Sequence, residues 1–192
     1  MDRPKSPVDV MVSDVQRPLL LIDIDGVISL FGGAGLPGQS SAGSSAPAGS
    51  FHSIEGIPHF LSATAAAHLL SLEPSFELVW ASGWEEKADE YLPRLLGLPA
   101  GLAHLRFPRA VGRSNAHWKL EAIDAFAGAR PLAWIDDALN DACHEWASAR
   151  QAPTLLVQTA PEHGLTAHET RLLEDWARGL SGSPPTAAGE AR

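Results

Sequence analysis

Short apolar runs alternate along this chain with longer stretches in which apolar residues recur every three or four positions. The first pattern predicts buried strands, and the second predicts helices that bury one face. The run LLLIDI at 19–24 stays apolar up to its first aspartate, which is typical of a strand covered on both faces of its sheet. We expect strands at 19–24, 76–81, 102–107, 131–135 and 153–158.

Helical spacing of apolar residues fills the segments between these strands. In 116–126, for example, Leu120, Ile123 and Phe126 fall on one side of a helix. We expect helices at 64–72, 85–96, 116–126, 138–149 and 167–180, and a small hairpin within 51–61. Strands separated by helices form parallel βαβ units. The pattern therefore predicts an α/β fold in three layers, with a doubly wound parallel sheet between helices.

Both ends of the chain differ in composition from its middle. Residues 1–17 and 182–192 are polar and contain proline, so we expect flexible tails around a single domain at 18–181. Within that domain, residues 32–50 are almost entirely Gly, Ser, Ala and Pro. Such a composition predicts a flexible low-complexity loop on the surface.

Composition narrows the class of protein. A hydrophobic content of 45% is enough for a packed core, and a net charge of −9 argues against broad, non-specific binding to nucleic acids or anionic membranes. The net charge does not exclude a local cluster of basic residues that binds an anion. The single cysteine, Cys143, permits neither an internal disulfide nor a cysteine-based zinc cluster. Because no apolar leader or bilayer-spanning run is present, we expect a cytoplasmic protein without a membrane partner.

Polar residues gather where the predicted strands end, and the carboxyl ends of parallel strands share one edge of a sheet. These residues are Asp23 and Asp25, Ser82 and Gly83, Asp136 and Asp137, with Lys119 in the helix before the fourth strand. Each has an ordinary structural alternative. Asp-x-Asp-Gly could form a turn, Ser82 or the later Asp pair could cap a helix, and Lys119 could be solvated.

Taken together, these side chains suit phosphoryl transfer. Four clustered carboxylates repel one another unless a cation lies among them, and a set of oxygen ligands favours Mg²⁺. One aspartate can attack phosphorus, while the other protonates the leaving oxygen and then deprotonates a water molecule. The hydroxyl and the ammonium group can bind the phosphoryl oxygens.

The order Asp-x-Asp-Gly-Val, Ser, Lys and Asp-Asp, spread over residues 19–158, resembles the haloacid dehalogenase (HAD) superfamily of phosphatases. The resemblance implies a Rossmann-like core with Asp23 as nucleophile and Asp25 as general acid and base. It also implies a phosphate-binding hydroxyl at Ser82 and a neutralising ammonium at Lys119. The segment 79–99, VWASGWEEKADEYLPRLLGLP, is similar to small HAD domains without a cap from bacterial RNA-repair proteins.

The same resemblance implies how Mg²⁺ is held. Its ligands would be Asp23, the backbone carbonyl of Asp25, and one acid of the motif DDALND. Asp136, Asp137 and Asp141 are alternatives for that last position, and we favour Asp137.

An open site is expected, since the segments between the motifs are too short to hold a cap domain. Five Lys or Arg residues and no acid occur from Arg94 to Lys119, a local inversion of the overall charge. Arg109 and Arg113 lie just before the Lys119 helix, where they form either a solvated basic loop or, with Gly83, part of the substrate site. The expected substrate is a phosphate monoester, with a nucleic-acid end or a nucleotide as the candidate.

Two other functions are compatible with parts of the pattern. A receiver-type signalling domain would carry its lysine after the last strand, whereas here Lys119 precedes the Asp pair. A non-catalytic module that binds Mg²⁺ or a partner would explain the acids without turnover.

Trp80 and Trp84 are expected to pack in the core, with the cleft as the alternative for Trp84. Most of the scattered histidines, which include His52 and His59, are expected at the surface.

Overall fold

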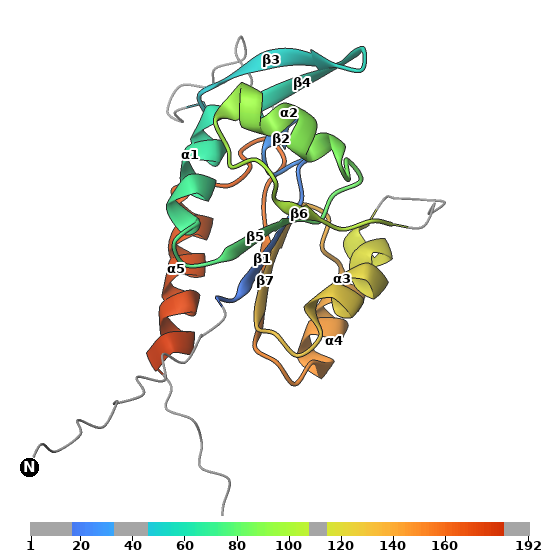
Figure 1. Cartoon of the computed structure of the whole chain (residues 1–192), viewed down its shortest axis with the longest axis vertical. Coiled ribbons are helices and arrows are strands. Elements are labelled where there is room, and N and C mark those ends of the chain that lie inside the picture. Colours follow the sequence, from blue (N-terminus) through green and yellow to red (C-terminus); the bar gives the residue numbers. More distant parts are fainter. Residues whose placement is uncertain (1–16, 33–45, 108–114, 183–192) are drawn as a thin grey trace, which may run out of the picture.

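A parallel five-stranded sheet forms the centre of the molecule (Figure 1). The computed structural model describes residues 17–32, 46–107 and 115–182. All pairings within the sheet are parallel, in the order β6-β5-β1-β7-β8. Its strands are β1 (Leu19–Ile22), β5 (Glu77–Trp80), β6 (Ala103–His104), β7 (Leu132–Asp136) and β8 (Thr154–Gln158). Each lies within a predicted strand segment or differs from it by one residue.

Helices cover both faces of this sheet. They are α1 (Ala63–Leu72), α2 (Lys87–Leu96), the 3₁₀ helix η1 (Ala116–Lys119), α3 (Leu120–Ala127), α4 (Asp141–Ala149) and α5 (Ala167–Gly182). In Figure 1, α1 and α5 lie on one side of the sheet, and α3 and α4 lie on the other. The predicted three-layer α/β fold with a doubly wound parallel sheet is therefore confirmed.

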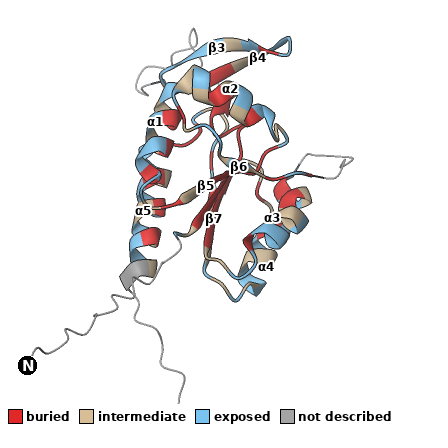
Figure 2. Ribbon diagram, viewed as in Figure 1, coloured by how far each residue is buried: buried red, intermediate tan, exposed pale blue. Residues whose placement is uncertain are grey.

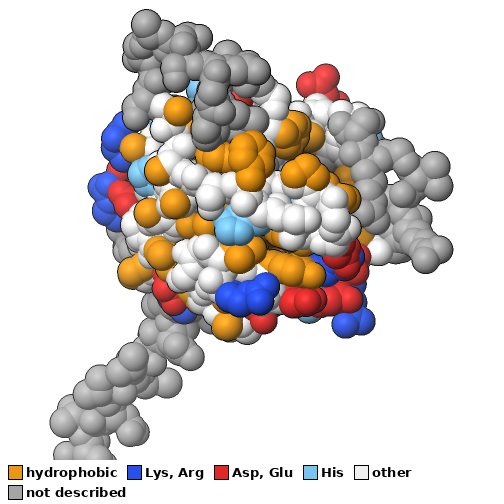
Figure 3. Space-filling view, turned by 90° about the horizontal axis from the view of Figure 1, so that it is seen from above, with side chains coloured by type: hydrophobic (Ala, Val, Ile, Leu, Met, Phe, Trp, Pro, Cys, Tyr) orange, Lys and Arg blue, Asp and Glu red, His pale blue; other side chains and the backbone are white. Residues whose placement is uncertain are grey.

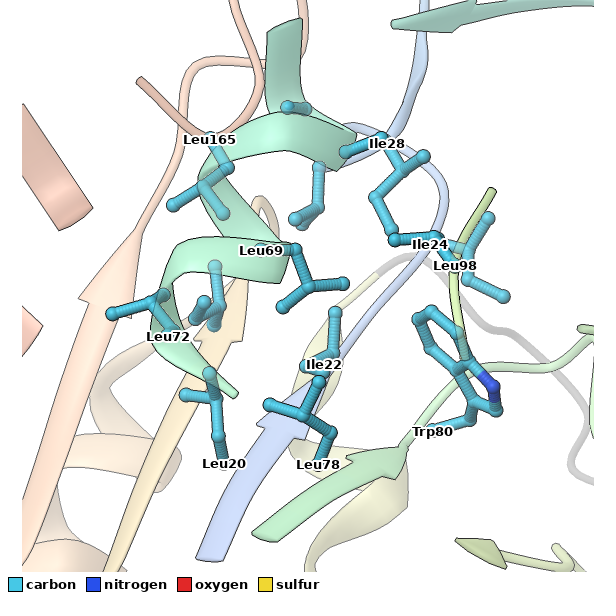
Figure 4. Close-up of a cluster of buried hydrophobic side chains, with 14 of the residues drawn as sticks. Leu20, Ile22, Ile24, Ile28, Leu69, Leu72, Leu78, Trp80, Leu98 and Leu165 are labelled. Carbon is cyan, nitrogen blue, oxygen red and sulfur yellow. The ribbon is translucent and has the colours of Figure 1, made fainter. Parts of the chain in front are cut away.

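The two faces of β1 explain why its sequence is apolar without interruption. Leu20 and Ile22 belong to one buried cluster, together with Leu69 of α1 and Leu78 of β5 (Figure 4). Leu19 and Leu21 point to the other face and belong to the second buried cluster, which includes side chains of α3 and β7. All four β1 side chains are completely buried, and Figure 2 shows the strands buried between helices with exposed outer faces. Burial of each such side chain contributes roughly 1.5–3 kcal/mol.

A small antiparallel sheet lies beside the central one, between β1 and β5 in the sequence. It comprises β2 (Ser29–Leu30), β3 (Gly49–Ile54) and β4 (Ile57–Ser62), in the order β2-β4-β3. The predicted hairpin is present but longer, because Gly49 and Ser50 belong to β3 rather than to the predicted loop. Viewed from above the hairpin, hydrophobic side chains form several separate patches (Figure 3). No large cap domain is present in the part of the chain that the structure describes.

Several predicted boundaries shift. The helix expected from residue 116 begins as the 3₁₀ helix η1. The helix expected from residue 138 begins at Asp141 instead. Asn140 is its N-cap, and the Asn140 side chain accepts a hydrogen bond from the Cys143 backbone N–H. The Asp pair therefore does not cap that helix. Ser82 does not cap α2 either, because Glu86 occupies that position.

Some predictions concern parts of the chain outside the described residues. These are most of both tails, residues 33–45 of the low-complexity loop, and the two basic residues Arg109 and Arg113. Within the described ranges, no helix combines the length and the apolar character that crossing a bilayer requires.

Candidate active site

The carboxyl end of β1 places two aspartates at the edge of the sheet. The backbone N–H of Asp23 donates to the Ile135 carbonyl of β7 at 3.0 Å, so the residue is still held by the sheet. Its side-chain Oδ1 accepts from the Ile24 N–H at 2.8 Å. The chain then turns at Gly26, which has a φ of +75° and whose N–H donates to the Ser29 carbonyl at 2.8 Å. This turn brings Asp25 back toward the same pocket.

A pocket of about 470 Å³ opens at this edge. Every predicted site residue within the described ranges lines it: Asp23, Asp25, Ser82, Gly83, Lys119, Asp136 and Asp137. Ser82 is buried after β5, and Gly83 is exposed. The structure therefore brings these side chains together, although they come from separate strands and from η1. The pocket also contains Phe31 and Trp118, which were not predicted as part of a site.

Lys119 is the cation at the base of the pocket. Its side chain is only 3% exposed, and Nζ lies 2.9 Å from Asp23 Oδ2 and 2.6 Å from Asp136 Oδ2. Burial lowers the pKa of Lys119, but the two carboxylates outweigh it and leave the pKa above its ordinary value. The Ala116 N–H donates to the Ala138 carbonyl at 2.9 Å, which joins η1 to the loop after β7. Lys119 is therefore a fixed, charged group.

Three carboxylates share this single ammonium group. Oxygen atoms of Asp23, Asp136 and Asp137 all lie within 4.8 Å of one another. Burial, followed by the charge of Asp23, raises the pKa of Asp136 to about 6. The same two causes also place the pKa of Asp137 above its ordinary value. Excess negative charge at this spacing, offered by oxygen ligands only, fits a divalent cation such as Mg²⁺.

Glycine at position 26 is required by this cluster. A Cβ on Gly26 would lie 2.4 Å from Cγ of Asp137, and the residue also has a positive φ. The Asp137 carboxyl group thus lies directly against the turn that carries Asp25. Gly26 therefore does more than form a turn. Because it has no side chain, the Asp137 carboxyl group can lie close to the turn that carries Asp25.

The three alternatives for the last metal ligand occupy different positions. Asp136 is completely buried, and its carboxylate already accepts from Lys119 and from the Ala138 N–H at 2.9 Å. Asp137 is half-buried and lies beside Gly26. Asp141 is exposed in the first turn of α4 and is not part of the acidic group. These positions support Asp137 as the ligand that we favour, with Asp136 as the residue that orients Lys119.

Asp25 has two neighbours that the sequence did not reveal. The Trp84 indole N–H donates to Asp25 Oδ2 at 3.0 Å, and His59 Nδ1 lies 3.8 Å from Asp25 Oδ1. The rings of His59 and Trp84 meet edge to face, with centroids 4.9 Å apart. Desolvation raises the pKa of Asp25, although the Trp84 hydrogen bond lowers it in part. A raised pKa suits a carboxyl group that must donate a proton.

These contacts correct the expectation for Trp84 and locate one of the scattered histidines. Trp84 packs against the core from one side but also lines the pocket, so the alternative of a cleft position is right for this residue. His59 is on β4, facing the site, and is not a surface histidine. The only sequence signal for Trp84 was its position two residues after Ser82. Trp80, by contrast, is completely buried as expected.

Comparison with known proteins agrees with this geometry. A family model described as the HAD domain in Swiss Army Knife RNA repair proteins matches residues 19–170. The match includes both aspartates after β1, Ser82, Lys119 and the Asp136–Asp137 pair at the end of β7. No curated protein matches the chain. The matched span covers most of the sequence, and the chain therefore belongs to this family of HAD domains.

Proposed function

We propose that this protein is a Mg²⁺-dependent phosphohydrolase that cleaves a phosphate monoester through an aspartyl-phosphate on Asp23. Family membership supports a phosphohydrolase of the HAD type in general. The observation that carries the finer proposal is the pairing of Asp23 and Asp25. Lys119 Nζ lies 2.9 Å from the Asp23 carboxylate. The Asp25 carboxylate instead accepts a hydrogen bond from the Trp84 indole N–H.

The two aspartates then have different chemical roles. Asp23 attacks phosphorus and the ester P–O bond breaks, while the Asp25 carboxyl group gives its proton to the leaving oxygen. In the second step, the Asp25 carboxylate takes a proton from a water molecule that attacks the phosphorus of the aspartyl-phosphate. Inorganic phosphate leaves, and the Asp23 carboxylate and the protonated Asp25 are restored.

Other residues of the chain stabilise the transferring group. Lys119 and the Ser82 hydroxyl are placed to neutralise and bind phosphoryl oxygens. Asp23, the Asp25 backbone carbonyl and Asp137 would hold Mg²⁺, which when bound supplies positive charge to the phosphoryl oxygens. Asp136 keeps the Lys119 ammonium group directed at Asp23.

A phosphorylated nucleic-acid end, or a nucleotide, is the substrate that we propose. The pocket is open, no large cap covers it among the described residues, and the family is described from RNA repair proteins. Arg109 and Arg113 stay a prediction for binding the rest of such a substrate.

Trapping the covalent intermediate tests this function. The protein is mixed with a ³²P-labelled phosphate ester and Mg²⁺, quenched in acid and treated with hydroxylamine, which cleaves acyl phosphates. We expect label on the wild-type protein that hydroxylamine releases, and none on the Asp23→Asn variant. Turnover without any trapped label in rapid-quench experiments, or label that persists in Asp23→Asn, would contradict the assignment. Absence of turnover with every ester and Mg²⁺ would instead favour the non-catalytic module.

A further inference from the structure

Aromatic side chains line the wall of the pocket above its charged base. Phe31, Trp84 and Trp118 come from three separate segments, namely the end of β2, the turn after β5, and η1. Two of them have partners that fix their rings. Trp84 donates to Asp25, and Trp118 packs edge to face against Phe107 with centroids 4.6 Å apart.

Phe31 differs from these two tryptophans. Its side chain is 47% exposed, and it has no ring contact among the described residues. Its backbone is nevertheless fixed, since its N–H donates to the Pro161 carbonyl at 3.1 Å and the preceding Leu30 is buried. The fold therefore presents a large apolar ring at the mouth of the pocket without burying it, which costs hydrophobic free energy unless a ligand covers it.

The size and charge of the pocket limit what that ligand can be. A volume of about 470 Å³ exceeds what a phosphate group alone needs and is within the range of small-molecule sites. The described lining contains four aspartates and one cation, Lys119, which is already paired with two of them. A second phosphate of a nucleic-acid backbone thus gains nothing from these walls, whereas a neutral planar ring can stack on them.

We propose that Phe31 is a stacking platform for the nucleobase next to the phosphate that is removed. This inference rests on the proposed phosphohydrolase function and deepens it, because it assigns recognition of the terminal nucleoside to the aromatic wall. Base stacking on aromatic side chains tolerates every base, since each base has a π-face. The site would then accept phosphorylated ends of any sequence and discriminate against ends that lack a base.

The test compares two oligonucleotides that differ only at the terminal residue. Both carry the same terminal phosphate, but one has a base at that residue and the other is abasic, so that charge and length are equal. The kcat/KM values are measured for the wild type, Phe31→Ala, Phe31→Trp and Phe126→Ala. Phe126 is a matched control because it is similarly exposed, at 40%, on α3 and does not line the pocket.

Removal of the Phe31 ring should lower kcat/KM for the base-bearing end by about 10-fold, with a change of less than about twofold for the abasic end. Phe31→Trp, which offers a larger ring, should exceed the wild type on the base-bearing end and match it on the abasic end, and this variant decides the question if Phe31→Ala does not fold. Phe126→Ala should match the wild type on both substrates.

Three results would overturn the proposal. Equal losses on the two ends would make Phe31 structural, and unchanged kinetics in both Phe31 variants would remove the subsite. A phosphotyrosine peptide that is hydrolysed more efficiently, and in a Phe31-dependent way, would reassign the platform to an aryl phosphate. If the wild type hydrolyses none of these substrates, the proposed function fails and not the subsite alone.

Discussion

The two ends of the central sheet carry charged clusters that differ in their balance of acidic and basic groups. At the amino end, Arg130 Nη2 lies 2.5 Å from Glu77 Oε2 and also donates to the Arg17 carbonyl at 3.0 Å. The hydrogen bond from Arg130 lowers the pKa of Glu77 there, and the charges of Arg130 and Arg17 lower it further. At the carboxyl end, three acids share Lys119, and burial raises the pKa values of Asp136 and Asp137.

This difference separates a structural ion pair from a functional site. The amino-end pair is partly exposed, so it contributes little stability. The carboxyl-end cluster is buried and has too much negative charge, which opposes folding until a cation or a proton compensates it. Proteins retain such unfavourable clusters where they perform chemistry.

Removing one carboxylate at each end should give the sharpest contrast. Asp23→Asn should lower phosphatase turnover on the order of 10⁴-fold or more, because an amide is a poor nucleophile. Glu77→Gln, the control at the amino end, should keep wild-type kcat and lose at most about 1 kcal/mol of stability. The measurements are kcat with p-nitrophenyl phosphate and urea unfolding. If Asp23→Asn keeps even a tenth of wild-type activity, Asp23 is not the nucleophile.

The second carboxylate after β1 should matter less. Asp25→Asn should lower kcat by about 10²–10⁴-fold, which is the usual contribution of a general acid and base. Acid-quench experiments should then show slow breakdown of the aspartyl-phosphate, since no group activates water. Full steady-state activity of this variant would show that another residue transfers the proton.

Trp84 offers a finer test of the same proton transfer. Trp84→Phe removes the indole N–H that holds Asp25 Oδ2 but keeps an aromatic ring. Hydrolysis of an alkyl phosphate, whose leaving oxygen needs a proton, should fall by about 10-fold to 10²-fold. Hydrolysis of p-nitrophenyl phosphate should fall much less, because its leaving group departs readily without one.

A matched variant controls for the loss of an indole hydrogen bond. Trp146 also donates to a carboxylate, Asp124 Oδ1 at 3.3 Å, but it does not line the pocket. Trp146→Phe should leave the ratio of the two rates unchanged. Equal losses on both esters in Trp84→Phe would mean that the indole only supports the fold. In an Asp25→Asn background, Trp84→Phe should have no further effect on the alkyl ester.

The sequence indicated which polar side chains gather at the sheet edge, but it did not indicate which side chains contact Asp25. The uninterrupted apolar run of β1 indicated a strand buried on both faces, and parallel strands necessarily bring their carboxyl ends to one edge. From those two facts, Asp23, Ser82 and Asp136 had to lie near one another. Lys119 was expected at the same edge because it lies in the helix before the fourth strand, and the structure shows it buried between two of these carboxylates.

The contacts of Asp25 could not be predicted, because they depend on how distant segments pack. Trp84 is 59 positions away in sequence, and His59 reaches Asp25 only through the register of the hairpin. A shift of that register by one residue would turn His59 to the opposite face of the hairpin. The helix expected from residue 138 begins three residues later for a local reason, because the Asn140 side chain accepts from the Cys143 N–H and caps the first turn there.

Magnesium should stabilise the carboxyl-end cluster in a way that depends on pH. Without metal, the folded state keeps a proton on Asp136 up to a pKa of about 6, against an ordinary value of 3.8. The contribution of this residue to stability is therefore greatest below pH 4 and is lost as the pH rises through 6. Loss of this proton adds a negative charge beside the proposed ligands Asp23 and Asp137, so the stabilisation that Mg²⁺ provides should grow over the same pH window.

Thermal unfolding with Mg²⁺ or with EDTA at pH 5 and pH 7.5 measures this effect. At a Mg²⁺ concentration of 100 times Kd, the stabilisation at pH 7.5 should be about 2.7 kcal/mol, or roughly 5–10 °C in Tm. At pH 5 the Mg²⁺-induced shift should be much smaller. Asp137→Asn should lose most of the shift, because it removes a proposed ligand, whereas Glu77→Gln should keep it. A shift that is equal at both pH values, or equal in the two variants, would place the bound cation away from these carboxylates and leave their raised pKa values without a function.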